Sequence, residues 1–172
     1  MPANKTLSKY DAAIERIEAK AQAAGVRLAA GASDEAIEAA QQKLGVTFPE
    51  EVVAFYRRHD GSDDEPAIEG RELLSLDSIV GEWKIWKDLL DQGTFNDNDH
   101  GTPDEGVQKK WWIPEWIPIT YDGCGNHHVL DLAPAEGGVY GQILSFWHDD
   151  DPRTVVGKGL LAWLESATWG DE

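Results

Sequence analysis

The first half of the chain carries apolar residues at the spacing of amphipathic helices. A first helix is predicted over residues 7–24, and a second begins at Ser33, whose side chain suits a helix N-cap. The residues that define the two apolar faces lie three or four positions apart: Ile14, Ile17 and Ala21, then Ile37, Ala40 and Leu44. Gly25 and the small residues that follow it indicate a loose connector between these helices.

Two further helices are predicted before the middle of the chain. Residues 48–61 read FPEEVVAFYRRHDG, with a proline and two glutamates for the first turn and Gly61 to end the helix. After a possible short strand in RELLSL, residues 77–92 form a helix that Asp77 or Ser78 caps. Its apolar residues lie at helical spacing and are predicted to be core: Ile79, Trp83, Trp86 and Leu90.

From Trp111 onward the pattern changes to short apolar runs that Gly, Asp and Pro turns separate. WIPIT, HHVLDL, VYGQILSFWH and RTVV are typical of strands, and GLLAWLESA closes the chain as a helix. Because the gaps are too short for crossover helices, the sheet is predicted to be mainly antiparallel. Helices first and strands second predict an α+β fold, a single domain with about four to six strands and helices packed around the sheet.

Charge narrows the class of partner. The formal net charge is −17 over 172 residues, which argues against nucleic acid or an anionic membrane as the ligand. The acid surplus favours a basic protein partner, although a well-solvated surface explains it equally well. One cysteine excludes an internal disulfide framework, and no apolar stretch of signal-peptide or membrane-span type is present. We therefore expect a cytoplasmic protein.

The stretch YDGCGNHHVLDL, residues 121–132, is the strongest candidate for chemistry. If residues 127–132 form a strand, His127 and His128 point to opposite faces and cannot easily bind one ion together. Cys124 lies between two glycines in an acidic chain, without the electropositive setting that activates a thiol. Turn chemistry around a small filler residue therefore explains the stretch better than a metal site or a nucleophile.

The remaining motifs also give no active site. HDDDP, residues 148–152, lacks the alternating oxygen ligands and the central glycine of a calcium loop. The chain has no phosphate-binding loop, no Gly-x-Ser-x-Gly elbow and no His-Glu-x-x-His pair. We predict a protein that is not an enzyme and needs no cofactor or metal. A metal-dependent enzyme that uses Cys124, His127 or residues 148–151 is the weakest alternative.

Three blocks in this order resemble the SUKH superfamily, the Smi/Knr-like group. They begin with LGVTFPEEVVAFYRRHDG and ELLSLDSIVGEWKIWKDL, and end with WWIPEWIPITYDGCGNHHVLDL, GVYGQILSFWHDD and GLLAWL. The most telling matches are the strand at 116–119, the Gly125-Asn126 turn and Asp131-Leu132. The resemblance covers residues 44–164. It suggests that residues 1–32 are an N-terminal helix and connector added locally to a domain of residues 33–172.

The resemblance implies a function in binding rather than in catalysis. Most bacterial members look like immunity proteins that neutralise a cognate toxin by stoichiometric occlusion, and fungal relatives are regulatory scaffolds. Our leading hypothesis from the sequence is an immunity protein for a basic toxin domain, such as a nuclease, and the alternative is a regulatory protein-binding module. The candidate contacts are three acidic loops and two tryptophans: Asp63, Asp64, Glu65, Asp97, Asp99, Asp104, Glu105, Asp149, Asp150, Asp151, Trp111 and Trp112.

Overall fold

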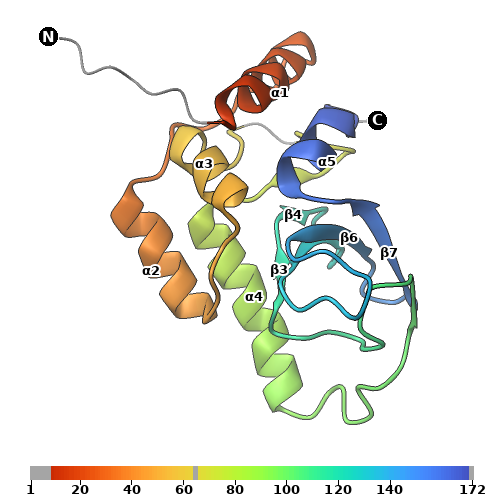
Figure 1. Ribbon diagram of the computed structural model, residues 1–172. Coiled ribbons are helices and arrows are strands. Elements are labelled where there is room, and N and C mark those ends of the chain that lie inside the picture. Colours follow the sequence, from red (N-terminus) through yellow and green to blue (C-terminus); the bar gives the residue numbers. More distant parts are fainter. Residues whose placement is uncertain (1–8, 64–65, 171–172) are drawn as a thin grey trace, which may run out of the picture.

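Helices fill the first half of the chain and most strands the second, as the α+β prediction requires (Figure 1). The computed structural model describes residues 9–63 and 66–170. Its helices are α1 (Asp11–Ala23), α2 (Asp34–Leu44), α3 (Glu50–Arg58), α4 (Leu76–Asp91) and α5 (Leu160–Ser166). Its strands are β1 (Glu72–Leu73), β2 (Thr102–Pro103), β3 (Trp116–Pro118), β4 (Thr120–Tyr121), β5 (His127–Asp131), β6 (Gln142–Phe146) and β7 (Pro152–Gly157).

A five-stranded sheet in the order β2-β7-β6-β5-β3 confirms the predicted strand number. Its pairings are antiparallel except for the short parallel contact between β2 and β7, and a separate antiparallel pair joins β1 to β4. The β2 strand was not predicted, because its two residues lie inside a long polar loop where no hydrophobic pattern marks a strand. None of the described helices combines the length and the apolar character that a membrane crossing needs.

The sheet is covered on both faces, and each face belongs to a separate apolar cluster. Leu130 and Ile143 pack with α1, α2, α3 and α5, whereas Val129 and Leu144 pack with the second half of α4 and with the loop before β3. In Figure 1, α4 lies beside the sheet and α5 crosses near one end of it. Trp86 belongs to the second cluster, which confirms the core prediction for that residue.

Three helix ends differ from the prediction. Helix α1 begins at Asp11, after a turn at residues 9 and 10, and the predicted helical residues 7 and 8 lie outside the described residues. Ser75 caps α4 by accepting a hydrogen bond from the Ser78 backbone N–H, so the helix begins one residue before the predicted caps. Helix α3 ends at Arg58, because His59 turns to an extended conformation and bonds to another segment. Gly61 has a φ of +80°, and a Cβ there would lie 2.6 Å from the Leu73 carbonyl oxygen, so glycine is required by this close approach rather than by the helix end.

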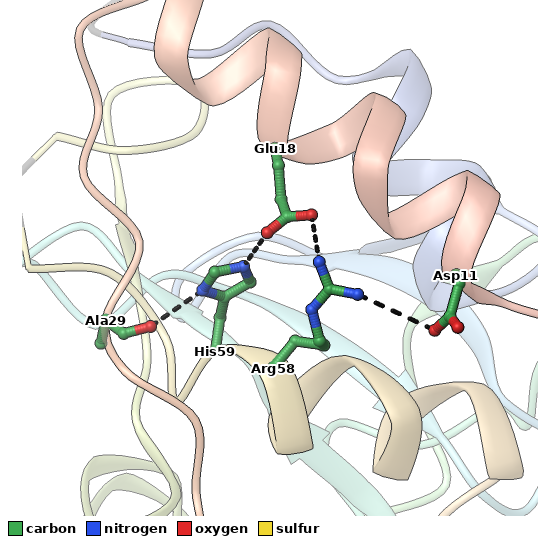
Figure 2. A network of polar contacts seen from close by, with 5 residues as sticks. All are labelled: Asp11, Glu18, Ala29, Arg58 and His59. Carbon is green, nitrogen blue, oxygen red and sulfur yellow. Dashed lines mark hydrogen bonds and ion pairs between the residues drawn. The ribbon is translucent and has the colours of Figure 1, made fainter. Parts of the chain in front are cut away.

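Helix α1 is tied to the rest of the fold by apolar and polar contacts. Ile14 and Ile17 are fully buried in the first cluster. Figure 2 shows the polar part, in which Glu18 lies between Arg58 and His59. The carboxylate accepts a hydrogen bond from Arg58 Nη2 at 2.7 Å and its other oxygen lies 2.7 Å from His59 Nε2, while His59 Nδ1 lies 2.9 Å from a carbonyl of the connector.

Replacing Ile17 tests whether α1 is part of the folding unit. Ile17→Ala should lower the free energy of unfolding by about 2–5 kcal/mol, because a fully buried side chain leaves a cavity. Glu15→Ala is the matched control, since Glu15 is exposed on the same helix and should change stability by about 0.5 kcal/mol or less. Chemical denaturation measures both, and equal midpoints for the two variants would show that α1 does not share the core.

Candidate functional site

Seven of the predicted contact carboxylates line one edge of the five-stranded sheet, which we call the acidic edge. The parallel pairing of β2 with β7 brings the two loops that carry them together, because Thr102 lies opposite Pro152. All seven residues are exposed: Asp97, Asp99, Asp104, Glu105, Asp149, Asp150 and Asp151. Asp63 is also exposed but lies on a different loop, bonded through its backbone N–H to Arg27, and Asp64 and Glu65 fall outside the described residues.

The buried side chain of Arg153 connects the two loops of the acidic edge by hydrogen bonds to their backbone. The guanidinium of Arg153 donates to the carbonyl oxygens of Trp111, Asp150 and Pro152 at 2.7–3.2 Å and lies between the rings of Trp111 and Phe146. Burial lowers the pKa of Arg153 to about 10, which leaves it charged at neutral pH. The Asp104 carboxylate also stabilises this edge, because it accepts a hydrogen bond from the Val155 backbone N–H.

The two predicted contact tryptophans have different environments. Trp111 is half-buried, with His100 stacked on its ring and the Arg153 guanidinium carbon 4.7 Å from the ring centroid. Trp112 is only 1% exposed and stacks near Trp86 inside the second apolar cluster. The expectation that Trp112 offers a surface contact is therefore wrong, because the sequence does not show which of two adjacent tryptophans faces the core.

The expected strand is β5, His127–Asp131, one residue shorter than predicted, and its two histidines point to opposite faces. His127 accepts a hydrogen bond at Nε2 from the Trp86 indole N–H (3.0 Å) and donates from Nδ1 to the Thr120 carbonyl oxygen (2.7 Å). Because an indole nitrogen can only donate, His127 is held as the neutral Nδ1–H tautomer. Burial lowers its pKa to about 4, in agreement with this arrangement.

His128 belongs to a polar network on the other face of the sheet. Thr120 Oγ1 lies 2.9 Å from its Nδ1, and Arg71 Nη1 lies 3.2 Å from Nδ1 and 3.4 Å from Nε2. The Glu69 carboxylate lies 3.2 Å from Nε2. Burial lowers the pKa of His128, and the hydrogen bond from His128 lowers that of Glu69. The network thus contains a neutral imidazole between a carboxylate and a guanidinium.

Glu69 adopts a backbone conformation that side chains rarely take. Within residues 9–63 and 66–170 it is the one non-glycine residue with positive φ (+50°), and Gly70 follows at +74°. Ile68 and Arg71 exchange backbone hydrogen bonds across this turn, which makes it a two-residue hairpin of type I′. The turn is also held from outside, because the Glu69 and Gly70 N–H groups donate to the carbonyl oxygens of Thr168 and Gly170.

This hairpin tip and the 121–126 turn border a hollow of about 430 Å³. Its described lining consists of Pro66, Gly70, Glu72, Tyr121, Asp122 and Gly123. Trp147 lies nearby, 44% exposed, with its ring centroid 5.3 Å from the Arg71 guanidinium carbon. We call Arg71, Glu72, Tyr121, Asp122 and Trp147 together the hairpin-tip surface.

The described residues offer little for catalysis. No group of three or more His, Cys, Asp and Glu side chains among them could hold a metal ion. Cys124 is exposed at the apex of the 121–126 turn, where Asp122 accepts the backbone N–H groups of Cys124 and Asn126. His127 and His128 are buried and bonded at both ring nitrogens. The candidate site is a hollow bordered by two turns, and hydrogen bonds hold Asp122 and Glu69 of these turns in place.

Sequence comparison places the chain in a family. The family model described as SMI1/KNR4 family (SUKH-1) matches residues 31–166. The chain belongs to the SMI1/KNR4 family. The match covers α2 to α5 and every described strand, and it begins after α1.

The relatives of this SMI1/KNR4 domain are longer proteins. It is 28% identical to the cell wall assembly regulator SMI1 of Saccharomyces cerevisiae, over 76% of this chain and 34% of that protein. It is 28% identical to the cell wall biosynthesis/cell cycle regulator smi1 of Schizosaccharomyces pombe (80% and 30%), and 26% identical to the glucan synthesis regulatory protein of Neurospora crassa (72% and 30%). The chain thus spans about a third of the length of these curated relatives.

Sequence reasoning missed three members of the hairpin-tip region: Glu69, Arg71 and Trp147. The Glu-Gly pair flanked by Ile68 and Arg71 was a signal for a tight turn. No feature of the sequence indicated that Trp147 is exposed. Trp147 directly follows the apolar run of β6 and therefore looks like a continuation of the buried strand, which in fact ends at Phe146.

The neutral state of His127 predicts acid sensitivity. The folded-state pKa of about 4 lies below the ordinary value of 6.5, so between these values the unfolded chain binds a proton that the folded protein does not. Stability is therefore fully present above pH 6.5 and falls as the pH drops, by about 2 kcal/mol between pH 7 and pH 5 from this residue.

The measurement is urea unfolding at pH 7, 6 and 5, with His127→Phe as the comparison. The variant keeps an aromatic ring beside Trp86 but cannot titrate, so it should lose less stability over this range even though it is less stable at pH 7. Burial of His128 should leave both proteins with some pH dependence in the same direction. Parallel curves for the wild type and the variant would contradict the assignment.

Proposed function

We propose that this SMI1/KNR4 domain is a regulatory protein-binding module that acts by stoichiometric association and not by catalysis. The observation that carries the proposal is the family match over residues 31–166 together with relatives that are named as regulators. Because the chain corresponds to about a third of each relative, the shared part is the domain and not the whole regulator.

The surface supports binding rather than turnover. Trp is among the residue types most often found in the energetic centre of protein interfaces, and the exposed Trp147 ring lies 5.3 Å from the buried Arg71 guanidinium at the hairpin-tip surface. His127 and His128, the two adjacent histidines of β5, are buried and hold their neighbours in place. These features agree with a rigid surface whose function is recognition.

Reconstitution with a captured partner tests the regulatory proposal. The tagged chain is used for affinity capture from its source cells, and the complex is rebuilt from purified components and analysed by sedimentation and mass spectrometry. We expect a fixed stoichiometric complex in which neither protein changes its covalent structure. Chemical change of the partner by substoichiometric amounts of this chain would overturn the proposal, as would failure of every captured protein to form a stoichiometric complex.

Immunity against a basic toxin is the second candidate, and the acidic edge is the observation that favours it. Seven exposed carboxylates on two adjoining loops, in a chain of net charge −17, would speed the capture of a basic protein and compete for its phosphate-binding cations. This function needs a toxic domain encoded beside the gene, and co-expression with that domain should restore growth.

Charge reversal at the acidic edge separates this candidate from a merely solvated surface. Asp97, Asp149 and Asp151 are exposed, and changing all three to Lys should slow association with the basic toxin by about tenfold or more at low salt. The matched control changes Glu15, Glu35 and Glu38 to Lys, which alters net charge equally on the helices. Equal association rates for the two triple variants, or rates insensitive to salt, would contradict electrostatic capture at this edge.

A further inference from the structure

We propose that the hairpin-tip surface binds a lysine or arginine side chain from a basic segment of a partner protein, with Trp147 packing against that segment. The inference rests on the proposed function, because it names the surface and the chemistry of the partner. The hairpin-tip surface adjoins the acidic edge, because Trp147 precedes Asp149–Asp151 in one loop and His148 bonds to Asn126 of the 121–126 turn, but its hollow is lined by other residues.

The hollow has the shape and lining that a long cationic side chain requires. The antiparallel pairing of β1 with β4 sets Glu72 opposite Tyr121, and both line the hollow together with Asp122. A side chain entering between the hairpin tip and the turn would lay its alkyl stem along Pro66 and Tyr121. Its charged end would then reach the two carboxylates.

The local charge selects a cation and disfavours an anion. The carboxylates of Glu72 and Asp122 line the hollow. Glu69, next to the lining residue Gly70, pairs with His128, and the Arg71 guanidinium interacts electrostatically with Asp122 and Glu69. Burial lowers the pKa of His128, so near neutral pH the carboxylates of Glu72, Asp122 and the neighbouring Glu69 outnumber the single guanidinium of Arg71. Burial opposes ionisation of Asp122, but its hydrogen bonds from Asn126 and Cys124 outweigh this effect and lower its pKa.

The walls of the hollow are already rigid before any partner binds. The Glu69 turn is bonded to Thr168 and Gly170, and Asp122 fixes the opposite turn through Cys124 and Asn126. Tyr121 stacks on the buried ring of His127, with centroids 5.2 Å apart. A partner therefore loses little affinity to the ordering of this surface, which is the cost that most often weakens a polar contact.

Trp147 is an independent sign of a contact surface. It follows the last residue of β6, so the fold does not need its ring to complete either apolar cluster, yet 44% of this large aromatic side chain is exposed. The Arg71 guanidinium, itself only 9% exposed, lies near the Trp147 ring and limits its movement. A fixed indole beside a cation-selective hollow fits a basic segment that also carries an apolar residue.

Titration with small probes tests the hollow without any partner. The probes are Nα-acetyl-arginine amide and Nα-acetyl-lysine amide, and Nα-acetyl-citrulline amide has nearly the shape of the first without its charge. We expect the cationic probes to shift the NMR signals of the Gly123 and Gly125 amides and of the Trp147 indole in a saturable way. Citrulline should have little effect on these signals.

Variants assign the effect to the hollow. Glu72→Gln keeps the size of the side chain and should weaken binding of the cationic probes by about two- to fivefold, the range for a partly exposed ion pair. Glu35→Gln removes an equal charge from α2 and should leave binding unchanged. The inference is overturned if no saturable shift occurs at these signals, if citrulline binds equally well, or if the two variants behave alike.

A captured partner gives the second readout. Trp147→Ala should weaken the complex about tenfold or more, whereas Ile85→Ala, which removes another exposed apolar side chain from α4, should leave it unchanged. A complex that survives both Trp147→Ala and Glu72→Gln would refute the hairpin-tip surface and leave the regulatory proposal intact. Saturable probe binding without any stoichiometric partner would refute the regulatory proposal and leave the cation-selective hollow intact.

Discussion

The complete burial of β5 is the constraint on which the rest of the structure depends. None of its five side chains reaches solvent, although three of them, His127, His128 and Asp131, are polar. Each buried polar group needs a partner, because an unpaired one costs about 1–3 kcal/mol. The fold supplies these partners from both sides of the sheet: α4 brings Trp86 to His127, and the hairpin tip brings Arg71 and Glu69 to His128.

This requirement explains why the most reactive-looking stretch of the chain is structural and still borders a surface suited to binding. The partners of His128 come from a tight turn, which the contact with His128 and two backbone bonds hold in an uncommon conformation. That turn then forms one wall of the hollow, and residues just before β5 form the other. The polar groups of the core thus fix the geometry of the surface above them.

Sequence reasoning predicted the features that depend on local pattern. The helix that Ser33 caps, the alternation of side chains along HHVLDL between the two faces of the sheet, and the antiparallel sheet were all readable from residue spacing and turn chemistry. The missed features depend on contacts between distant segments. Residues 102–103 become a strand only because β7 lies beside them, and Trp112 is distinguished from Trp111 only by the position of α4. For the same reason the hairpin-tip surface was invisible, since its parts come from three separate regions of the chain.

The two acidic surfaces have different physical capacities. The carboxylates of the acidic edge are exposed on loops, where solvent and salt screen them, so they influence the rate of encounter more than the lifetime of a complex. At the hairpin-tip surface, the charges lie in a rigid hollow beside an anchored indole, which is the arrangement that slows dissociation. The acidic edge would speed the first encounter with a basic partner, and the hairpin-tip surface would then slow the dissociation of that partner. Mutations at the edge would then act mainly on association rates, and mutations at the hairpin tip mainly on dissociation rates.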